Sequence, residues 1–124
     1  MLELKDFEAA YNKVQEVVLP TKLIKSDYFS DQTGNDVYLK PENMQLTGAY
    51  KIRGAYYKIS TLSEEEKAKG LITASAGNHA QGVALAAARQ GVKATIVMPT
   101  TTPLLKVNRT KRSWSRSDPS WRCL

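Results

Sequence analysis

The stretch "LITASAGNHAQGVALAAARQGVKATIVMP", residues 71–99, decides the fold class. Its first part, "LITAS" at 71–75, is a short apolar run typical of a strand, and "KATIVMP" at 93–99 is a second such run. Between them, "AGNHAQG" has the composition of a loop, and the alanine-rich "VALAAARQG" predicts a helix that ends near Gly91. This order predicts two parallel strands joined by a crossover helix.

The same alternation of strands and helices continues on both sides of this unit. Before this unit, the pattern predicts a helix over residues 4–18, a strand over 36–40, a helix over 48–60 and a short capped helix over 63–70. After it, the pattern predicts a final helix over 102–111. In the short helix, Ser63 would be the N-cap and Gly70 the C-cap. The predicted fold class is therefore α/β, with an open parallel sheet of about three strands and flanking helices.

Composition limits the kind of protein. The chain has 124 residues and 42% hydrophobic residues, which suits one globular domain. No apolar run approaches the ~20 residues needed to cross a bilayer, and the first residues lack the layout of a signal peptide, so we expect a cytoplasmic protein. Cys123 and His79 are the single cysteine and the single histidine. We therefore expect no disulfide framework within the chain and no metal site built from cysteines or several histidines.

The net charge of +6 is concentrated at the end of the chain. Residues 1–105 hold 12 Lys and Arg against 11 Asp and Glu, whereas residues 106–124 hold six cations and a single anion, Asp118. A basic tail of this kind can bind nucleic acid, so a small non-catalytic module with such a tail is one alternative. Because the body of the protein is nearly neutral, we favour a protein that binds no nucleic acid.

The loop "SAGNHAQG" at 75–82 is a candidate binding site. It would lie where a parallel strand ends and a helix begins, and ligands bind at such places in α/β sheets. Small residues allow close approach of the backbone, the helix N-terminus offers free N–H groups to an anion, and Ser75, Asn78 and His79 add hydrogen-bonding side chains. The alternative is a plain turn in which Ser75 or Asn78 caps the helix. The loop matches neither a Walker A motif nor a G-x-G-x-x-G motif.

A second candidate is Lys51, in "TGAYKIRGAYYKI" at 47–59. A lysine in a helical stretch is ordinarily solvated. Here its neighbours are small, and the positive end of the helix dipole disfavours a cation near the helix N-terminus. A neutral amine is the form that attacks a carbonyl carbon. We expect the nearby Arg53 to make a structural ion pair and assign it no chemistry.

Three segments in this order resemble one enzyme family. "ENMQLTGAYKIRGA" at 42–55, "TASAGNHAQGVA" at 73–84 and "MPTTTPLLKV" at 98–107 are similar to the N-terminal part of the threonine dehydratases, or threonine ammonia-lyases. These are fold-type II pyridoxal-phosphate enzymes, and the resemblance extends over about residues 5–111. Serine racemases share the form of the first segment, so a serine racemase or another fold-type II amino-acid lyase is a further alternative.

The resemblance implies a cofactor, pyridoxal 5'-phosphate, and a role for each matched residue. Lys51 matches the lysine that forms a Schiff base with the cofactor aldehyde and later removes the α-proton of the substrate. Asn78 matches the residue that hydrogen-bonds the 3'-oxygen of the cofactor. The loop that grips the substrate carboxylate is matched by Ser75, Ala76, Gly77, Asn78 and His79. No metal is implied.

The implied reaction is β-elimination of L-threonine, or of L-serine, to 2-oxobutanoate, or pyruvate, and ammonia. Family members form homo-oligomers. They also place the glycine-rich loop that binds the cofactor phosphate later in the chain than any segment present here. We therefore expect residues 1–111 to form the N-terminal part of a catalytic domain, an incomplete fold-type II domain that is inactive by itself.

Residues 112–124, "RSWSRSDPSWRCL", show no periodicity and do not continue the resemblance. Tryptophan has a single codon, TGG, so a shift of the reading frame by one base turns Trp114 and Trp121 into glycines whatever base follows. With allowed codons elsewhere, the shifted frame can encode Asp-His-Gly-Ala-Glu-Val-Thr-Leu-His-Gly-Asp-Val-Tyr, which fits the continuation of the family. We therefore expect this tail to be the product of a frameshift.

Overall fold

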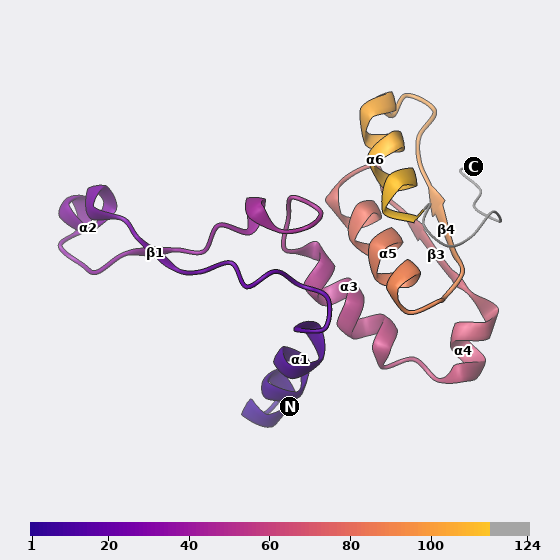
Figure 1. The fold of residues 1–124 in the computed structure, drawn as a ribbon, viewed down its shortest axis with the longest axis horizontal. Coiled ribbons are helices and arrows are strands. Elements are labelled where there is room, and N and C mark those ends of the chain that lie inside the picture. Colours follow the sequence, from indigo (N-terminus) through magenta and orange to yellow (C-terminus); the bar gives the residue numbers. More distant parts are fainter. Residues whose placement is uncertain (115–124) are drawn as a thin grey trace.

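The computed structural model of the protein describes residues 1–114. In chain order its helices and strands are α1 (Leu4–Val14), β1 (Ile24–Lys25), α2 (Asp27–Thr33), β2 (Tyr38–Leu39), the 3₁₀ helix η1 (Glu42–Met44), α3 (Lys51–Ser60), α4 (Glu64–Lys69), β3 (Leu71–Ala74), α5 (Asn78–Arg89), β4 (Ala94–Val97) and α6 (Leu104–Trp114). Helix α5 lies at the centre of the larger part, where it contacts α3, α6 and both strands β3 and β4 (Figure 1). The predicted tail lies outside the described residues, apart from residues 112–114 at the end of α6.

The predicted parallel unit is confirmed. β3 and β4 pair in parallel, in a register that runs from Leu71 opposite Ala94 to Ala74 opposite Val97, and α5 forms the crossover between them. Ala94 and Ile96 of β4 are buried in the core cluster with residues of α5. They lie two apart, and alternate residues of a strand face the same side of the sheet. The opposite face of the sheet carries Ile72, which is 76% exposed. The helices thus cover one face of this sheet, as in an incomplete α/β domain.

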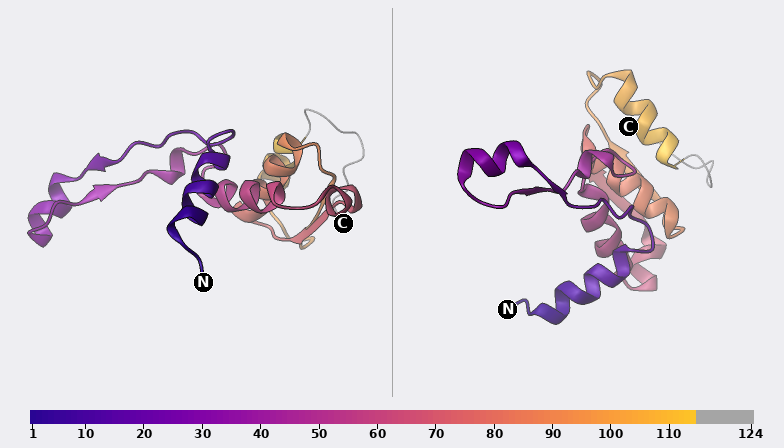
Figure 2. Two further views of the ribbon diagram at one scale, coloured as in Figure 1. Left: turned by 90° about the horizontal axis from the view of Figure 1, so that it is seen from below. Right: turned by 60° about the vertical axis from the view of Figure 1, so that its left-hand side comes forward.

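The predicted first strand does not belong to the parallel sheet, and this part of the prediction was wrong. β2 instead pairs antiparallel with β1 in a separate two-stranded sheet. The two strands are close in the chain, since only α2 and short turns separate them. An ion pair also links the segments that contain them, with the Lys25 ammonium 2.7 Å from the Asp36 carboxylate. This hairpin, with α2 at its tip, extends away from α3, α5 and α6 in every view (Figure 2). The sheet of about three parallel strands is therefore reduced to two.

The two caps predicted for the short helix α4, Ser63 and Gly70, are confirmed. The Ser63 hydroxyl accepts a hydrogen bond from the Glu66 N–H at 3.2 Å, and the Glu66 carboxylate accepts one from the Ser63 N–H at 2.8 Å. This reciprocal pair is a capping box, which confirms Ser63 as the N-cap of α4, and Gly70 follows the helix as its C-cap, as predicted. No helix within residues 1–114 is long and apolar enough to span a membrane.

The core brings the N-termini of two helices, α3 and α5, to the same end of the molecule. Ile52 of α3, Ala80 and Ala84 of α5 and Ile96 of β4 are fully buried in one cluster. The small alanine side chains of α5 let α3, α6 and the strands approach it closely. In this packing, α3 and α5 begin at the same end of the helical layer, close to the carboxyl end of β3 (Figure 1).

Candidate functional site

The loop after β3 is fixed by backbone bonds at the edge of the sheet. The Ser75 N–H donates to the Val97 carbonyl at 3.0 Å, which extends the parallel ladder by one residue. The Ser75 hydroxyl accepts a hydrogen bond from the Gly77 N–H at 3.3 Å, and Gly77 is the N-cap of α5. The first N–H groups of α5 have no intrahelical acceptor, so they are available to an anion. Ser75, Ala76 and Gly77 are half-buried, whereas Asn78 and His79 are exposed.

Lys51 is the first residue of α3, and its side chain is half-buried. Its ammonium lies 5.0 Å from the centre of the Tyr50 ring, which is a cation–π distance. Within residues 1–114, its side chain makes no hydrogen bond and no ion pair. A primary amine that is half-buried and unpaired is available for chemistry with a carbonyl compound.

Gly82 brings Lys51 and the loop together. A Cβ atom on Gly82 would lie 3.1 Å from the Lys51 carbonyl carbon and 3.2 Å from the Ile52 nitrogen, so only a glycine allows α5 this close to the first turn of α3. Asn78 precedes Gly82 by four residues and therefore lies on the same side of α5, about 6 Å closer to its N-terminus. Lys51 and Asn78 are thus the first residues of two helices that pack against each other and begin at the same end of the helical layer.

His79 faces a different part of the structure. It lines a cavity of about 230 Å³ together with Gly54 and Lys58 of α3 and residues of β3, and Lys51 does not line this cavity. Of the five predicted loop residues, Asn78 is thus the one placed on the side of α5 that faces Lys51.

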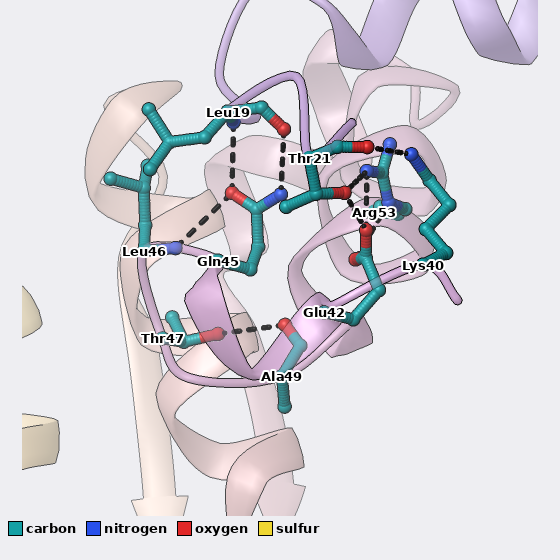
Figure 3. Close-up of polar contacts among 9 residues, drawn as sticks. All are labelled: Leu19, Thr21, Lys40, Glu42, Gln45, Leu46, Thr47, Ala49 and Arg53. Atoms are coloured by element: carbon teal, nitrogen blue, oxygen red, sulfur yellow. Dashed lines mark hydrogen bonds and ion pairs between the residues drawn. The ribbon is translucent and has the colours of Figure 1, made fainter. Parts of the chain in front are cut away.

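Sequence reasoning missed a polar cluster that precedes Lys51 (Figure 3). The Arg53 guanidinium lies 2.7 Å from the Glu42 carboxylate, so the ion pair expected of Arg53 is confirmed. Arg53 is the main cause that lowers the pKa of Glu42 to about 2, and the Thr21 hydroxyl adds to it. Gln45 is 4% exposed, and its amide is bonded to the backbone of Leu19. Glu42 and Gln45 both lie in "ENMQLTGAYK", but the local pattern of this segment does not indicate their partners at residues 19–21.

The residues present fit a carbonyl-bearing cofactor and a substrate with an anionic group. The unpaired Lys51 amine can attack an aldehyde carbon. The free N–H groups at the start of α5 can bind an anion, and the Asn78 amide can hydrogen-bond an oxygen on the cofactor ring. Among residues 1–114, no group of three or more His, Cys, Asp and Glu side chains could hold a metal ion.

Comparison with known proteins agrees with this reading of the residues. A family model described as "Pyridoxal-phosphate dependent enzyme" matches residues 14–113. L-threonine ammonia-lyase of Thermotoga maritima is 53% identical over 111 residues, which are 90% of this chain and 28% of that protein. The chain therefore spans less than a third of the length of this relative.

Two solved structures share the fold. Threonine deaminase isoform 2 of Solanum lycopersicum, in its processed form, superposes with a TM-score of 0.76 at 41% identity, over 90% of this chain and 32% of that one. Maize serine racemase superposes with a TM-score of 0.84 at 33% identity, over 98% of this chain and 35% of that one. The arrangement of α3, the loop and α5 thus occurs within chains about three times as long.

Proposed function

Because the chain belongs to the pyridoxal-phosphate dependent enzymes, we propose that residues 1–111 are the N-terminal part of the catalytic domain of a threonine ammonia-lyase. The reaction would be the β-elimination of L-threonine to 2-oxobutanoate and ammonia, and L-serine would give pyruvate. The observation that carries the proposal is the half-buried, unpaired Lys51 amine, which the close contact with Gly82 holds beside the start of α5. The 53% identity to a threonine ammonia-lyase supports the choice of reaction.

Each residue of the site has a separate task in this proposal. Lys51 would bind pyridoxal 5'-phosphate through its amine and afterwards take the α-proton of the amino acid. Asn78 would hydrogen-bond the ring oxygen of the cofactor, and the loop Ser75–His79 would hold the substrate carboxylate through its N–H groups. The bound cofactor would supply an electron sink for the negative charge that develops at the α-carbon.

A serine racemase is the second candidate, because maize serine racemase shares the fold. Both activities need the amine of Lys51 to take a proton from the α-carbon, so the residues on α3 and α5 do not separate them. The higher identity to the ammonia-lyase than to the racemase favours elimination. A full-length protein built on this chain would form 2-oxobutanoate from L-threonine if the first proposal is correct and D-serine from L-serine if the second is.

The test of the proposal is attachment of the cofactor to Lys51. We expect that adding pyridoxal 5'-phosphate to the full chain produces the visible absorbance of a lysine-bound cofactor, and that Lys51→Ala removes this absorbance completely. Lys58→Ala is the matched control, because Lys58 is an exposed lysine on the same helix, and it should leave the absorbance unchanged. Equal absorbance in the wild type and in Lys51→Ala would contradict the proposal, and tight, salt-sensitive binding of nucleic acid without absorbance would favour the non-catalytic module.

We also propose that residues 112–124 are a frameshift product. The family model matches residues 14–113 and so ends within the first residues of this segment, which supports a boundary near its start. We expect the coding DNA, read one base further on from about Lys111, to encode two glycines in place of Trp114 and Trp121 and then many codons of family-like sequence. A stop codon at once in the shifted frame would contradict the proposal. The homo-oligomeric state, the cytoplasmic location and the absence of nucleic-acid binding stay predictions.

A further inference from the structure

Four polar side chains form what we call the loop latch: Thr21, Glu42, Gln45 and Arg53 (Figure 3). They join three separate parts of the chain: the segment after α1, the loop from η1 to α3, and α3 itself. The assigned cofactor and substrate residues do not include any of them. The question is why a half-buried ion pair and a buried amide lie directly before the lysine helix.

Glu42 connects the N-terminal segment to α3. Its two carboxylate oxygens accept hydrogen bonds from Nε and Nη2 of Arg53 at 2.9 and 2.7 Å, which is the geometry of a two-pronged pair. One of these oxygens also accepts a hydrogen bond from the Thr21 hydroxyl at 2.5 Å. Lys40 donates to the Thr21 carbonyl and so closes the cluster on its other side. The exposed fractions of the Arg53 and Glu42 side chains are 26% and 17%, so water screens the pair only in part.

Gln45 holds the loop itself. Its Oε1 accepts from the Leu19 N–H at 2.9 Å and from the Leu46 N–H at 3.1 Å, and its Nε2 donates to the Leu19 carbonyl at 3.0 Å. Its own carbonyl accepts from the Gly48 N–H at 2.7 Å, in a tight turn where Gly48 has a φ of +68°. This turn leads directly into Lys51, so the place where α3 begins depends on where Gln45 is held.

The latch also sets how α3 is rotated about its axis. Residues two apart in a helix project about 200° apart, so Lys51 and Arg53 point to opposite sides of α3. Fixing Arg53 on Glu42 therefore turns Lys51 away from the N-terminal segment. The backbone of Lys51 and Ile52, in the first turn of α3, contacts Gly82, and this contact fixes the distance between α3 and α5.

We propose that Glu42 and Gln45 are positioning residues for Lys51: by fastening the loop before α3 to residues 19–21, they aim the Lys51 amine at the start of α5. This inference rests on the proposed function of Lys51 as the cofactor-binding residue. Neither side chain touches the cofactor or the substrate in this proposal, and each acts through the position of the first turn of α3.

A purely structural role would lower the stability of the domain without a selective effect on one lysine. The readout must therefore compare Lys51 with a second lysine of the same helix, and Lys58 serves this purpose because it lies outside the latch and is exposed. The full chain is incubated with pyridoxal 5'-phosphate and reduced with borohydride, and the ratio of label on Lys51 to label on Lys58 is measured by mass spectrometry. In parallel, acetic anhydride, a small amine reagent without cofactor chemistry, gives the ratio of acetylation at the two lysines.

In Glu42→Gln we expect the cofactor ratio of Lys51 to Lys58 to fall about tenfold, because a misplaced reacting group loses most of its advantage. The acetylation ratio should rise, because the freed turn exposes the Lys51 amine. Glu66→Gln is the matched control: it removes a carboxylate from the capping box of α4, far from Lys51 in the chain, and should leave both ratios unchanged.

Arg53→Lys keeps a cation opposite Glu42 but loses the two-pronged geometry, so it should give an intermediate cofactor ratio. It also decides the question if Glu42→Gln fails to fold. Unchanged ratios in both latch variants, with a lower unfolding midpoint, would overturn the inference. Failure of the wild type to label Lys51 above Lys58 with the cofactor would instead count against the proposed function, while the acetylation ratio would still report whether the latch positions the lysine.

Discussion

Gly82→Val is expected to lower the free energy of unfolding by about 3 kcal/mol and to abolish the attachment of pyridoxal 5'-phosphate to Lys51. Even the first added carbon would lie 3.1 Å from the Lys51 carbonyl carbon and 3.2 Å from the Lys51 oxygen. These neighbours are backbone atoms of a helix, so they cannot move aside as the end of a flexible side chain could. α3 and α5 would have to separate, which would carry Lys51 away from Asn78.

Gly54→Val is the matched control for this prediction. Gly54 is also a helical glycine, on α3, but a Cβ atom there meets nothing within 4 Å. Its replacement should change the free energy of unfolding by no more than about 0.5 kcal/mol. Urea denaturation of both variants measures the difference, and the visible absorbance with cofactor measures the site. Equal losses in the two variants would show that the contact between Gly82 and α3 limits neither stability nor the site.

The parallel unit could be predicted from the sequence because its signals are local. The apolar runs at 71–75 and 93–99 are each bounded by turn residues, and the alanine-rich segment between them can pack closely on several sides, as the burial of α5 shows. The capping box of α4 likewise needs residues only three apart. Such features require no knowledge of distant parts of the chain.

The pairing of the N-terminal third could not be predicted in the same way. An alternating run such as residues 36–40 indicates a strand but not its partner, and here the partner is β1 rather than β3. Similarly, the apolar residues Leu4, Phe7 and Tyr11 correctly predict a helix, yet they are 73, 60 and 64% exposed in α1. The periodicity indicates which face is apolar and contains no information on what covers it.

For the candidate site, the sequence indicated the residues with reactive or hydrogen-bonding groups but not the contacts that hold them in place. Lys51 and the loop at 75–79 could be singled out by residue type and position. The contact of Gly82 with the backbone of α3 could not, because a glycine in a helix has many explanations until its neighbours are known. The bond between Gln45 and Leu19 joins residues 26 positions apart, beyond the reach of any local pattern.

Acid is expected to weaken the latch over a defined range of pH. The pKa of Glu42 is lowered from 4.5 to about 2 by Arg53, so the folded protein favours the carboxylate more than the unfolded chain does. This contribution to stability is complete above the unfolded pKa and is lost as the pH falls from 4.5 to about 2. We expect the free-energy difference between the wild type and Glu42→Gln to shrink by about 2–3 kcal/mol across this range, measured by urea denaturation at each pH.

Removing Arg53 shows whether the latch is the cause of this pH dependence. Arg53→Gln leaves the Glu42 carboxylate without its main partner, so the pKa of Glu42 should return toward its usual value and the acid-dependent loss should largely disappear. The double variant Glu42→Gln with Arg53→Gln should then have the same pH profile as Arg53→Gln alone, because the two side chains act as one pair. An unchanged acid loss in Arg53→Gln would place the titrating group elsewhere. It would also remove the electrostatic reason for expecting Glu42 to hold the first turn of α3, and with it Lys51, in place.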